Sequence, residues 1–190
     1  KGAAVRAGLA EARGDWRLMM DADNAARVVE VDKLLAKASG SIGLVAGSRS
    51  VESSEVTGKG FRKLTGFAFK AALWTMGLRL ARDTQCGFKL YRADVAEAIA
   101  EYGVEDRFAF DLEHLLLTRR LGCGVEEVGI RWRHVDGGQI NPVLDGIRMV
   151  GRAARIRVRD YGELRLPERA ASEVEAKPAP RVAGVSADGN

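Results

Sequence analysis

Short, mainly apolar runs alternate along this chain with segments in which apolar residues recur every three or four positions. The runs at residues 18–20, 42–46 and 88–91 have the length of buried β-strands. A fourth strand is predicted at residues 125–135, where apolar and polar positions alternate. Helical periodicity predicts helices at residues 2–13, 28–39, 61–80, 95–102 and 104–120, and a last one from residue 142 onward. Helices that alternate with strands in this way predict an α/β domain.

The first predicted strand ends in two aspartates that are one residue apart, Asp21 and Asp23. Ligands of open α/β sheets gather outside the carboxyl ends of strands. If the chain stays extended after Met20, residues i and i+2 project to the same side, so both carboxylates can face one hard cation. The pattern therefore favours a Mg²⁺ or Mn²⁺ ion that carries a diphosphate.

Three interpretations of this motif remain open on the local pattern. Asp and Asn favour turns because they bond their own backbone, so the motif can be a simple turn. A haloacid-dehalogenase-type phosphatase also has Asp-X-Asp after an apolar strand, but that motif normally continues with Thr or Val, whereas Asn24 follows here. The third interpretation is the metal-binding Asp-X-Asp of a nucleotide-sugar glycosyltransferase.

Three more polar residues lie next to predicted strands. The strand at 42–46 leads into Gly47-Ser48-Arg49, and a planar guanidinium can bind two phosphate oxygens at once. Thr84 and Gln85 precede the strand at 88–91, where they can face a ligand.

Asp111 and Glu113 are candidate catalytic carboxylates in the helix predicted at 104–120. Both lie early in that helix. Negative charge is favoured there by the helix dipole, so simple charge placement is the competing explanation.

Charge and cysteine content exclude some classes of function. The 30 Lys and Arg against 26 Asp and Glu leave a net charge of +4, too modest to indicate a nucleic-acid partner without a concentrated basic patch. Cys86 and Cys123 form no CxxC pair, and neither histidine has the spacing of a metal ligand, so we expect two buried or reduced thiols.

Two predicted helices combine apolar and basic residues. In the last helix one basic stripe consists of Arg148, Arg152, Arg155 and Arg159, and an adjacent apolar face consists of Val143, Ile147, Val150, Ala154 and Val158. Such a helix can lie on an anionic membrane or can simply present a solvated arginine face. The helix at 61–80, rich in aromatic and basic residues, is either a core helix or an interfacial one, and its apolar runs are too short to span a bilayer.

The chain begins with Lys1 and enters a helix at once, so we expect it to be the later part of a longer chain. Residues 1–166 are predicted to form one domain. Residues 167–190 have little to bury and are predicted to be a disordered tail.

Several segments, taken in order, resemble glycosyltransferase family 2, in particular its dolichyl-phosphate β-glucosyltransferases and other polyprenyl-phosphate enzymes. The similar segments are KGAAVRAGLAEARGDWRLMMDAD, GSR, RDTQCGFKLYRADVAEAI, DRFAFDLEHL and VGIRWRHVDGGQINP. The resemblance extends from Lys1 to about Tyr161. Asn24 departs from the pattern, since a Gly is common there.

The resemblance implies a GT-A (Rossmann-like) fold whose first nucleotide-binding units are missing from this chain. It implies inverting transfer of a hexose from a nucleotide sugar, UDP-glucose favoured, to a polyprenyl or dolichyl phosphate at the cytoplasmic face of a membrane. A family 2 enzyme that acts on a sugar hydroxyl in polysaccharide synthesis and a non-catalytic membrane-surface module are the alternatives.

The resemblance also assigns roles to residues. Asp21 and Asp23 would hold Mg²⁺ or Mn²⁺ and the diphosphate, and Arg49 would meet acceptor or donor phosphate. Thr84, Gln85 and Gly87 would line the sugar and acceptor side. Asp111 and Glu113 would lie near the transferred sugar.

Overall fold

The computed structural model describes residues 1–57, 71–135 and 142–167, with the side chains of 142–145 left out. Its elements in chain order are α1 (Gly2–Glu11), β1 (Trp16–Met20), the 3₁₀ helix η1 (Val28–Glu30), α2 (Val31–Leu35), β2 (Ile42–Ser48), β3 (Glu55–Thr57), β4 (Phe88–Arg92), α4 (Ala93–Tyr102), α5 (Phe110–Arg120), β5 (Gly124–Gly129), β6 (Arg131–Arg133) and α6 (Pro142–Val158). The predicted tail, from residue 168 on, lies outside the described residues.

The main sheet has four strands in the order β1-β4-β2-β5. β2 and β5 are parallel, whereas β4 is antiparallel to both β1 and β2. Its first residue, Phe88, is paired with the last residue of β1, Met20. β4 therefore begins beside the carboxyl ends of β1 and β2, and the turn before β4 lies next to those strand ends.

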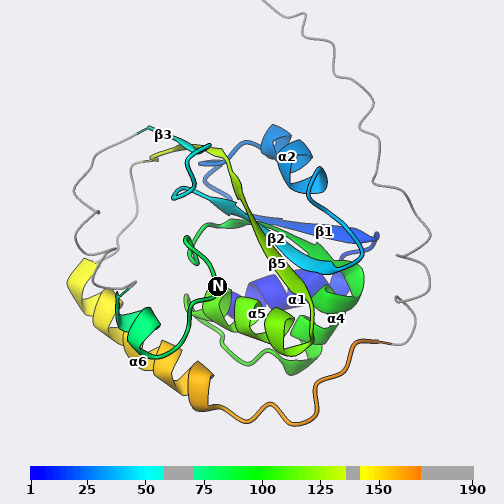
Figure 1. The fold of residues 1–190 in the computed structure, drawn as a ribbon, viewed down its shortest axis with the longest axis vertical. Helices are drawn as coiled ribbons and strands as arrows, with labels where there is room; N and C mark the ends of the chain where they lie inside the picture. The colour runs from blue at the N-terminus through cyan, green and yellow to red at the C-terminus, as the bar shows by residue number, and fades with distance from the viewer. Residues whose placement is uncertain (58–70, 136–141, 168–190) are drawn as a thin grey trace, which may run out of the picture.

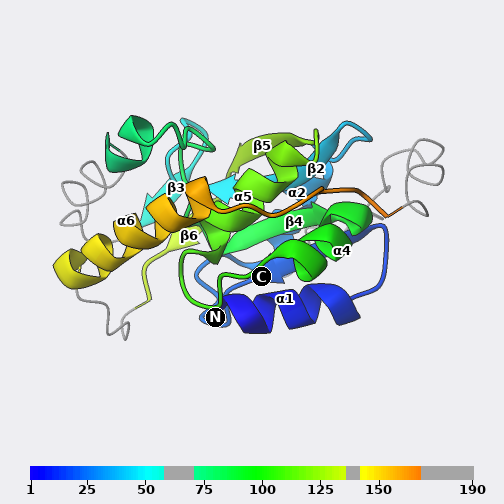
Figure 2. The ribbon, with the colours of Figure 1, turned by 90° about the horizontal axis from the view of Figure 1, so that it is seen from below.

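Helices cover both faces of this sheet, as Figures 1 and 2 show. α1, α4 and α5 pack on one face and α2 packs on the other. The side chains of β4 alternate between the two layers because successive residues of a strand point to opposite faces. Phe88 and Leu90 contact the cluster around Leu34 of α2, and Tyr91 contacts the cluster that contains α5. The predicted α/β architecture is confirmed.

The strand predicted at 125–135 is in fact two strands in two sheets. β5 ends at Gly129, which packs so closely on Ser53 that a side chain there would overlap it. β6 then pairs in parallel with β3 in a separate two-stranded sheet. No element is predicted from the sequence at the three-residue β3, because its short, exposed segment shows no alternation of apolar and polar positions.

Helix boundaries also differ from the predictions. The helix predicted at 104–120 begins only at Phe110, because residues 103–109 form a loop. The helix predicted at 28–39 divides into η1 and the five-residue α2. Of the helix predicted at 61–80, residues 61–70 lie outside the described residues, and the part that follows is helical only to residue 75, before Gly77 with φ +72°.

Helix α6 packs on the domain with a different face from the apolar face that the sequence indicates. Ala153 and Ile156 are buried, whereas Ile147 and Val158 are 67% and 81% exposed. The segment after α6 runs back along α5, with Leu164 and Leu166 against the core. Within the described ranges, no helix is long and apolar enough to cross a membrane.

We expect Ala153→Asp to lower the free energy of unfolding by about 2 kcal/mol or more, because it places a carboxylate in the buried contact of α6. The neighbouring Ala154→Asp, on the exposed face, should change it by no more than about 0.5 kcal/mol. Urea denaturation of both variants measures the difference. Equal stabilities would contradict this docking face of α6.

Candidate active site at the strand ends

Asp21 lies directly after β1, and its position depends on Gly87. The backbone N–H of Asp21 donates to the carbonyl of Gly87 at 2.9 Å. A Cβ on residue 87 would overlap the Asp21 carboxylate, so only glycine allows this close approach. The ammonium of Lys1 lies 2.6 Å from Asp21 Oδ1, so this carboxylate already attracts a cation.

Asp23 is exposed and lies in a turn rather than in an extended strand. The N–H of Asn24 donates to the carbonyl of Asp21, and the N–H of Ala25 donates to Asp23 Oδ1 at 3.0 Å. Asn24 has φ +55°, a left-handed conformation that Asn tolerates. The argument from strand alternation is therefore wrong for this pair, and the turn interpretation describes the local backbone correctly.

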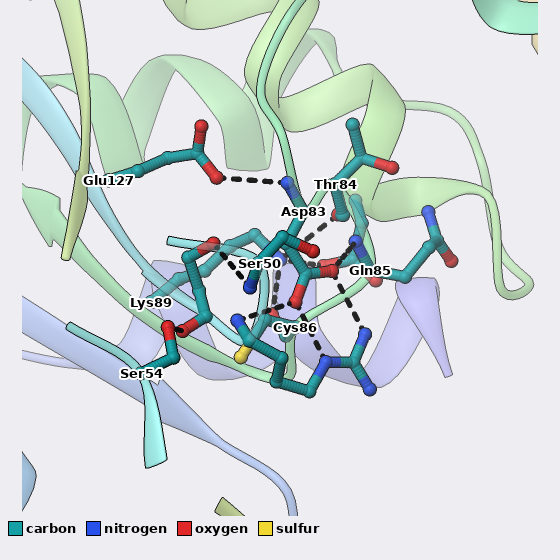
Figure 3. Close-up of polar contacts among 11 residues, drawn as sticks. Ser50, Ser54, Asp83, Thr84, Gln85, Cys86, Lys89 and Glu127 are labelled. Carbon is teal, nitrogen blue, oxygen red and sulfur yellow. Dashed lines mark hydrogen bonds and ion pairs between the residues drawn. The ribbon is translucent and has the colours of Figure 1, made fainter. Parts of the chain in front are cut away.

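A buried lysine joins the turn before β4 to α5. The ammonium of Lys89, which is fully buried, donates to Asp111 Oδ1 at 2.5 Å, to the carbonyl of Cys86 at 2.5 Å and to the carbonyl of Thr84 at 3.4 Å. Figure 3 shows Thr84, Cys86 and Lys89 in this arrangement. An ammonium has three N–H donors, and each of them has an acceptor here.

Burial raises the pKa of Asp111, and the nearby Asp21 acts in the same direction, while the Lys89 ammonium opposes both. Burial also raises the pKa of the Cys86 thiol to about 11. Cys86 is therefore a neutral thiol near neutral pH and does not have the reactivity of a thiolate nucleophile.

Arg49, at the end of β2, is bound to Asp83 in the turn before β4. Its Nε and Nη2 donate to the two Asp83 oxygens at 2.7 and 2.9 Å, and its backbone N–H donates to Asp83 as well. Burial alone would raise the pKa of Asp83, but the Arg49 guanidinium outweighs burial and lowers it. Glu127 of β5 accepts the backbone N–H of Asp83 at 2.9 Å (Figure 3).

The side-chain amide of Gln85 lies in the same turn. Its Nε2 is buried and has no hydrogen-bond partner among the described residues. A buried amide donor without a partner is costly in an isolated protein, so this atom is suited to meet a ligand oxygen.

Glu113 points away from the other candidate residues. Residues two apart on a helix do not share a face, so Glu113 lies on the far side of α5 from Asp111. Glu113 is fully buried and accepts the backbone N–H groups of Val104 and Glu105 and the hydroxyl of Tyr161. These bonds give it a structural role in holding the loop before α5 and the segment after α6.

The structure thus gathers Asp21, Thr84, Gln85, Gly87 and Asp111 around one turn, with Arg49 beside it, and leaves Glu113 outside. Sequence reasoning did not select Asp83 or Lys89. The signal for Lys89 was a charged residue inside an otherwise apolar strand, because such a charge needs a buried partner.

Comparisons with known proteins agree with this architecture. The family described as "Glycosyl transferase family 2" matches residues 1–100, which include every candidate residue except those on α5. Dolichyl-phosphate beta-glucosyltransferases are similar to the chain. The protein of Dictyostelium discoideum is 35% identical over 168 residues, covering 84% of this chain and 51% of that protein.

Two further relatives with this name show the same extent of similarity. The Drosophila melanogaster protein is 35% identical over 157 residues (78% of this chain, 48% of that protein). The Saccharomyces cerevisiae protein is 32% identical over 163 residues (78% and 49%). The chain thus spans about half the length of the curated relatives it matches. From the family match and its mixed sheet with helices on both faces, the chain belongs to glycosyltransferase family 2 and has the Rossmann-like GT-A fold.

Proposed function

We propose that this chain is part of an inverting enzyme that transfers a hexose from a nucleotide sugar, with UDP-glucose favoured, to dolichyl or another polyprenyl phosphate. The observation that carries the proposal is the 30–35% identity to proteins named dolichyl-phosphate beta-glucosyltransferase. The family match contains Asp21, Arg49 and Gln85, which lie at one edge of the sheet.

The residues at the end of β1 fit a divalent cation that arrives with its nucleotide. Mg²⁺ is commonly bound by one or two carboxylates together with substrate phosphates. Asp21 and Asp23 would supply such a pair from the turn after β1, and the cation would replace the Lys1 ammonium on Asp21 Oδ1. Within the part of the chain that the structure describes, no group of three or more His, Cys, Asp and Glu is placed to hold a metal by itself. A bound cation would stabilise the departing nucleoside diphosphate.

The chain's own side chains would orient the two substrates. The unpartnered amide of Gln85 can donate to a sugar or phosphate oxygen. Two donor nitrogens of Arg49 are engaged by Asp83, so its third nitrogen, Nη1, is the atom suited to a phosphate oxygen. Asp83 thereby fixes the direction in which Arg49 meets its ligand.

A cleft of 660 Å³ beside this turn suits an anionic headgroup. Its lining includes Ser50, Trp74 and three arginines, Arg79, Arg82 and Arg119, and on the β5 side the carboxylates Glu126 and Glu127, so a headgroup phosphate would meet the arginine side of the cleft. Trp74 is 58% exposed with the Arg79 guanidinium over its ring. Ser50 and Arg82 adjoin Arg49 and Asp83, so an acceptor phosphate in this cleft would approach the strand ends from the side of β5.

The exposed face of α6 supports attachment of this part of the chain to a membrane surface, which we propose is the cytoplasmic one. Ile147, Ala154 and Val158 form an exposed apolar stripe, and Arg155 and Arg159 lie beside it. Arg152 is turned toward the domain, where it pairs with Glu105 at 2.5 Å. This combination of exposed apolar and basic residues is typical of interfacial helices.

The direct test supplies the full-length protein with UDP- and GDP-sugars, Mn²⁺, and either a polyprenyl phosphate or a soluble sugar acceptor. Transfer to the lipid phosphate supports the proposal. Transfer to the sugar hydroxyl alone would instead support a polysaccharide-building enzyme, and no transfer to either would support a membrane-surface module.

Asp21→Asn and Asp23→Asn should each reduce metal-dependent transfer by about a hundredfold or more, because each removes a charged oxygen ligand. Initial rates across a Mn²⁺ titration measure the loss, and thermal unfolding should show that the fold is kept. Asp32→Asn on α2, which makes the same chemical change away from the site, is the control. Full activity in either site variant would refute the metal assignment.

Asp111→Asn should leave measurable transfer to a lipid phosphate, since a phosphate monoester has a second pKa of about 6 and arrives largely ionised. Raising the pH should not restore the lost rate, because no proton has to be removed from this acceptor. A pH–rate profile with both acceptor types checks this. A loss that high pH reverses would identify Asp111 as a base for a hydroxyl acceptor.

Changing Arg155 and Arg159 together to Gln should weaken binding to anionic liposomes by roughly 30-fold at low salt, at about 1 kcal/mol per basic residue. The apparent KM for polyprenyl phosphate should rise more than that for the nucleotide sugar. Arg13→Gln with Lys37→Gln, an equal change of charge on exposed residues elsewhere, is the matched control. Equal liposome affinity of the two double variants would contradict the membrane role of α6.

A further inference from the structure

Lys89 is a buried cation whose ammonium makes three hydrogen bonds. Two go to the turn before β4 and one goes to α5, and both segments carry candidate site residues. The Thr84 carbonyl belongs to the peptide that joins Thr84 to Gln85, and the Cys86 carbonyl belongs to the peptide that joins Cys86 to Gly87. Both accept from the Lys89 ammonium. One side chain therefore fixes the orientation of the two peptide planes on either side of the Gln85–Cys86 peptide; Figure 3 shows Thr84, Gln85, Cys86 and Lys89 together at this turn.

The same ammonium reaches the two other parts of the site. Asp111, in the first turn of α5, accepts its third N–H. Gly87, next to the Cys86 carbonyl, accepts the N–H of Asp21 and leaves room for the Asp21 carboxylate. A shift of the Cys86–Gly87 peptide would therefore move Asp21 as well.

The geometry points to Lys89 as a positioning residue of the active site. Its buried ammonium fixes the 84–87 turn relative to Asp111, and this turn then fixes the positions of Gln85 and Asp21. The identity of the ligands that these groups meet rests on the proposed function. Lys89 is fully buried and so does not touch a substrate. Its effect on the reaction passes through the residues that it holds.

A second buried ion pair on the same strand provides a matched control. Arg92, at the other end of β4, donates to both oxygens of Asp94 at 2.6 and 2.8 Å. Its remaining contacts are the Gly40 carbonyl and the Cys123 sulfur, away from the strand-end edge that carries Asp21. Breaking either pair leaves a buried carboxylate without its cation, so both changes lower stability for the same physical reason.

The test compares Lys89→Met with Arg92→Met in the full-length protein, by amide hydrogen exchange and by steady-state kinetics at a temperature where both are folded. In Lys89→Met, the amides of Asp21 and Gln85 should exchange at least about tenfold faster than in the wild type. The kcat should fall by about a hundredfold, with the KM for the nucleotide sugar changed much less. Arg92→Met should show neither effect. If Lys89→Met does not fold, Lys89→Gln, whose neutral amide keeps two N–H donors, takes its place with Arg92→Gln as its control.

Faster exchange confined to residues 21–24 and 84–87, together with the selective loss of kcat, supports the positioning role. Equal exchange at these amides in the two variants, or equal kcat per folded molecule, overturns it and leaves Lys89 with a purely structural role. The exchange measurement needs no substrate. A failure of the proposed lipid-phosphate transfer would therefore appear in the wild type and would remain distinguishable from a failure of this inference.

Discussion

The antiparallel entry of β4 between β1 and β2 is the constraint on which the site depends. If β4 ran parallel to β1 and β2, the turn before it would lie at their amino-terminal ends, far from Asp21 and Arg49. Because β4 runs the other way, residues 83–87 arrive where β1 and β2 end. The strand ends and the turn can then exchange hydrogen bonds directly, as Asp21 does with Gly87 and Arg49 with Asp83.

Buried charge in this region is neutralised in pairs that each cross from one element to another. Lys89 of β4 is bound to Asp111 of α5, and Arg49 beyond β2 is bound to Asp83 in the turn. Such pairs contribute little net stability, because desolvation offsets much of their attraction, but removing one partner is costly. Their value here is geometric, since each pair fixes the separation of two segments that are far apart in the sequence.

Local sequence patterns predicted the site residues that lie next to strand ends. They did not predict the ion pairs between residues that are distant in the sequence. The apolar run before Asp21 and the short strand after Gly87 were visible, and both lie where predicted. The ion pairs of Lys89 and Arg49 were not visible, since partners 22 and 34 residues away follow from strand order rather than from periodicity. The turn at Asp23 was one of the interpretations left open, because an Asp-X-Asp motif looks the same in sequence whether it lies in a strand or in a turn.

Helix α5 carries two carboxylates, Asp111 and Glu113, which lie on opposite sides of the helix and have different partners. Asp111 faces the turn before β4, whereas Glu113 anchors the loop at Val104 and the hydroxyl of Tyr161. A survey of single substitutions would find both positions intolerant and would group them as one functional motif. A measurement of both the amount of folded protein and the turnover of each folded molecule would separate the two effects. A change at Glu113 would lower the first, and a change at Asp111 would lower the second.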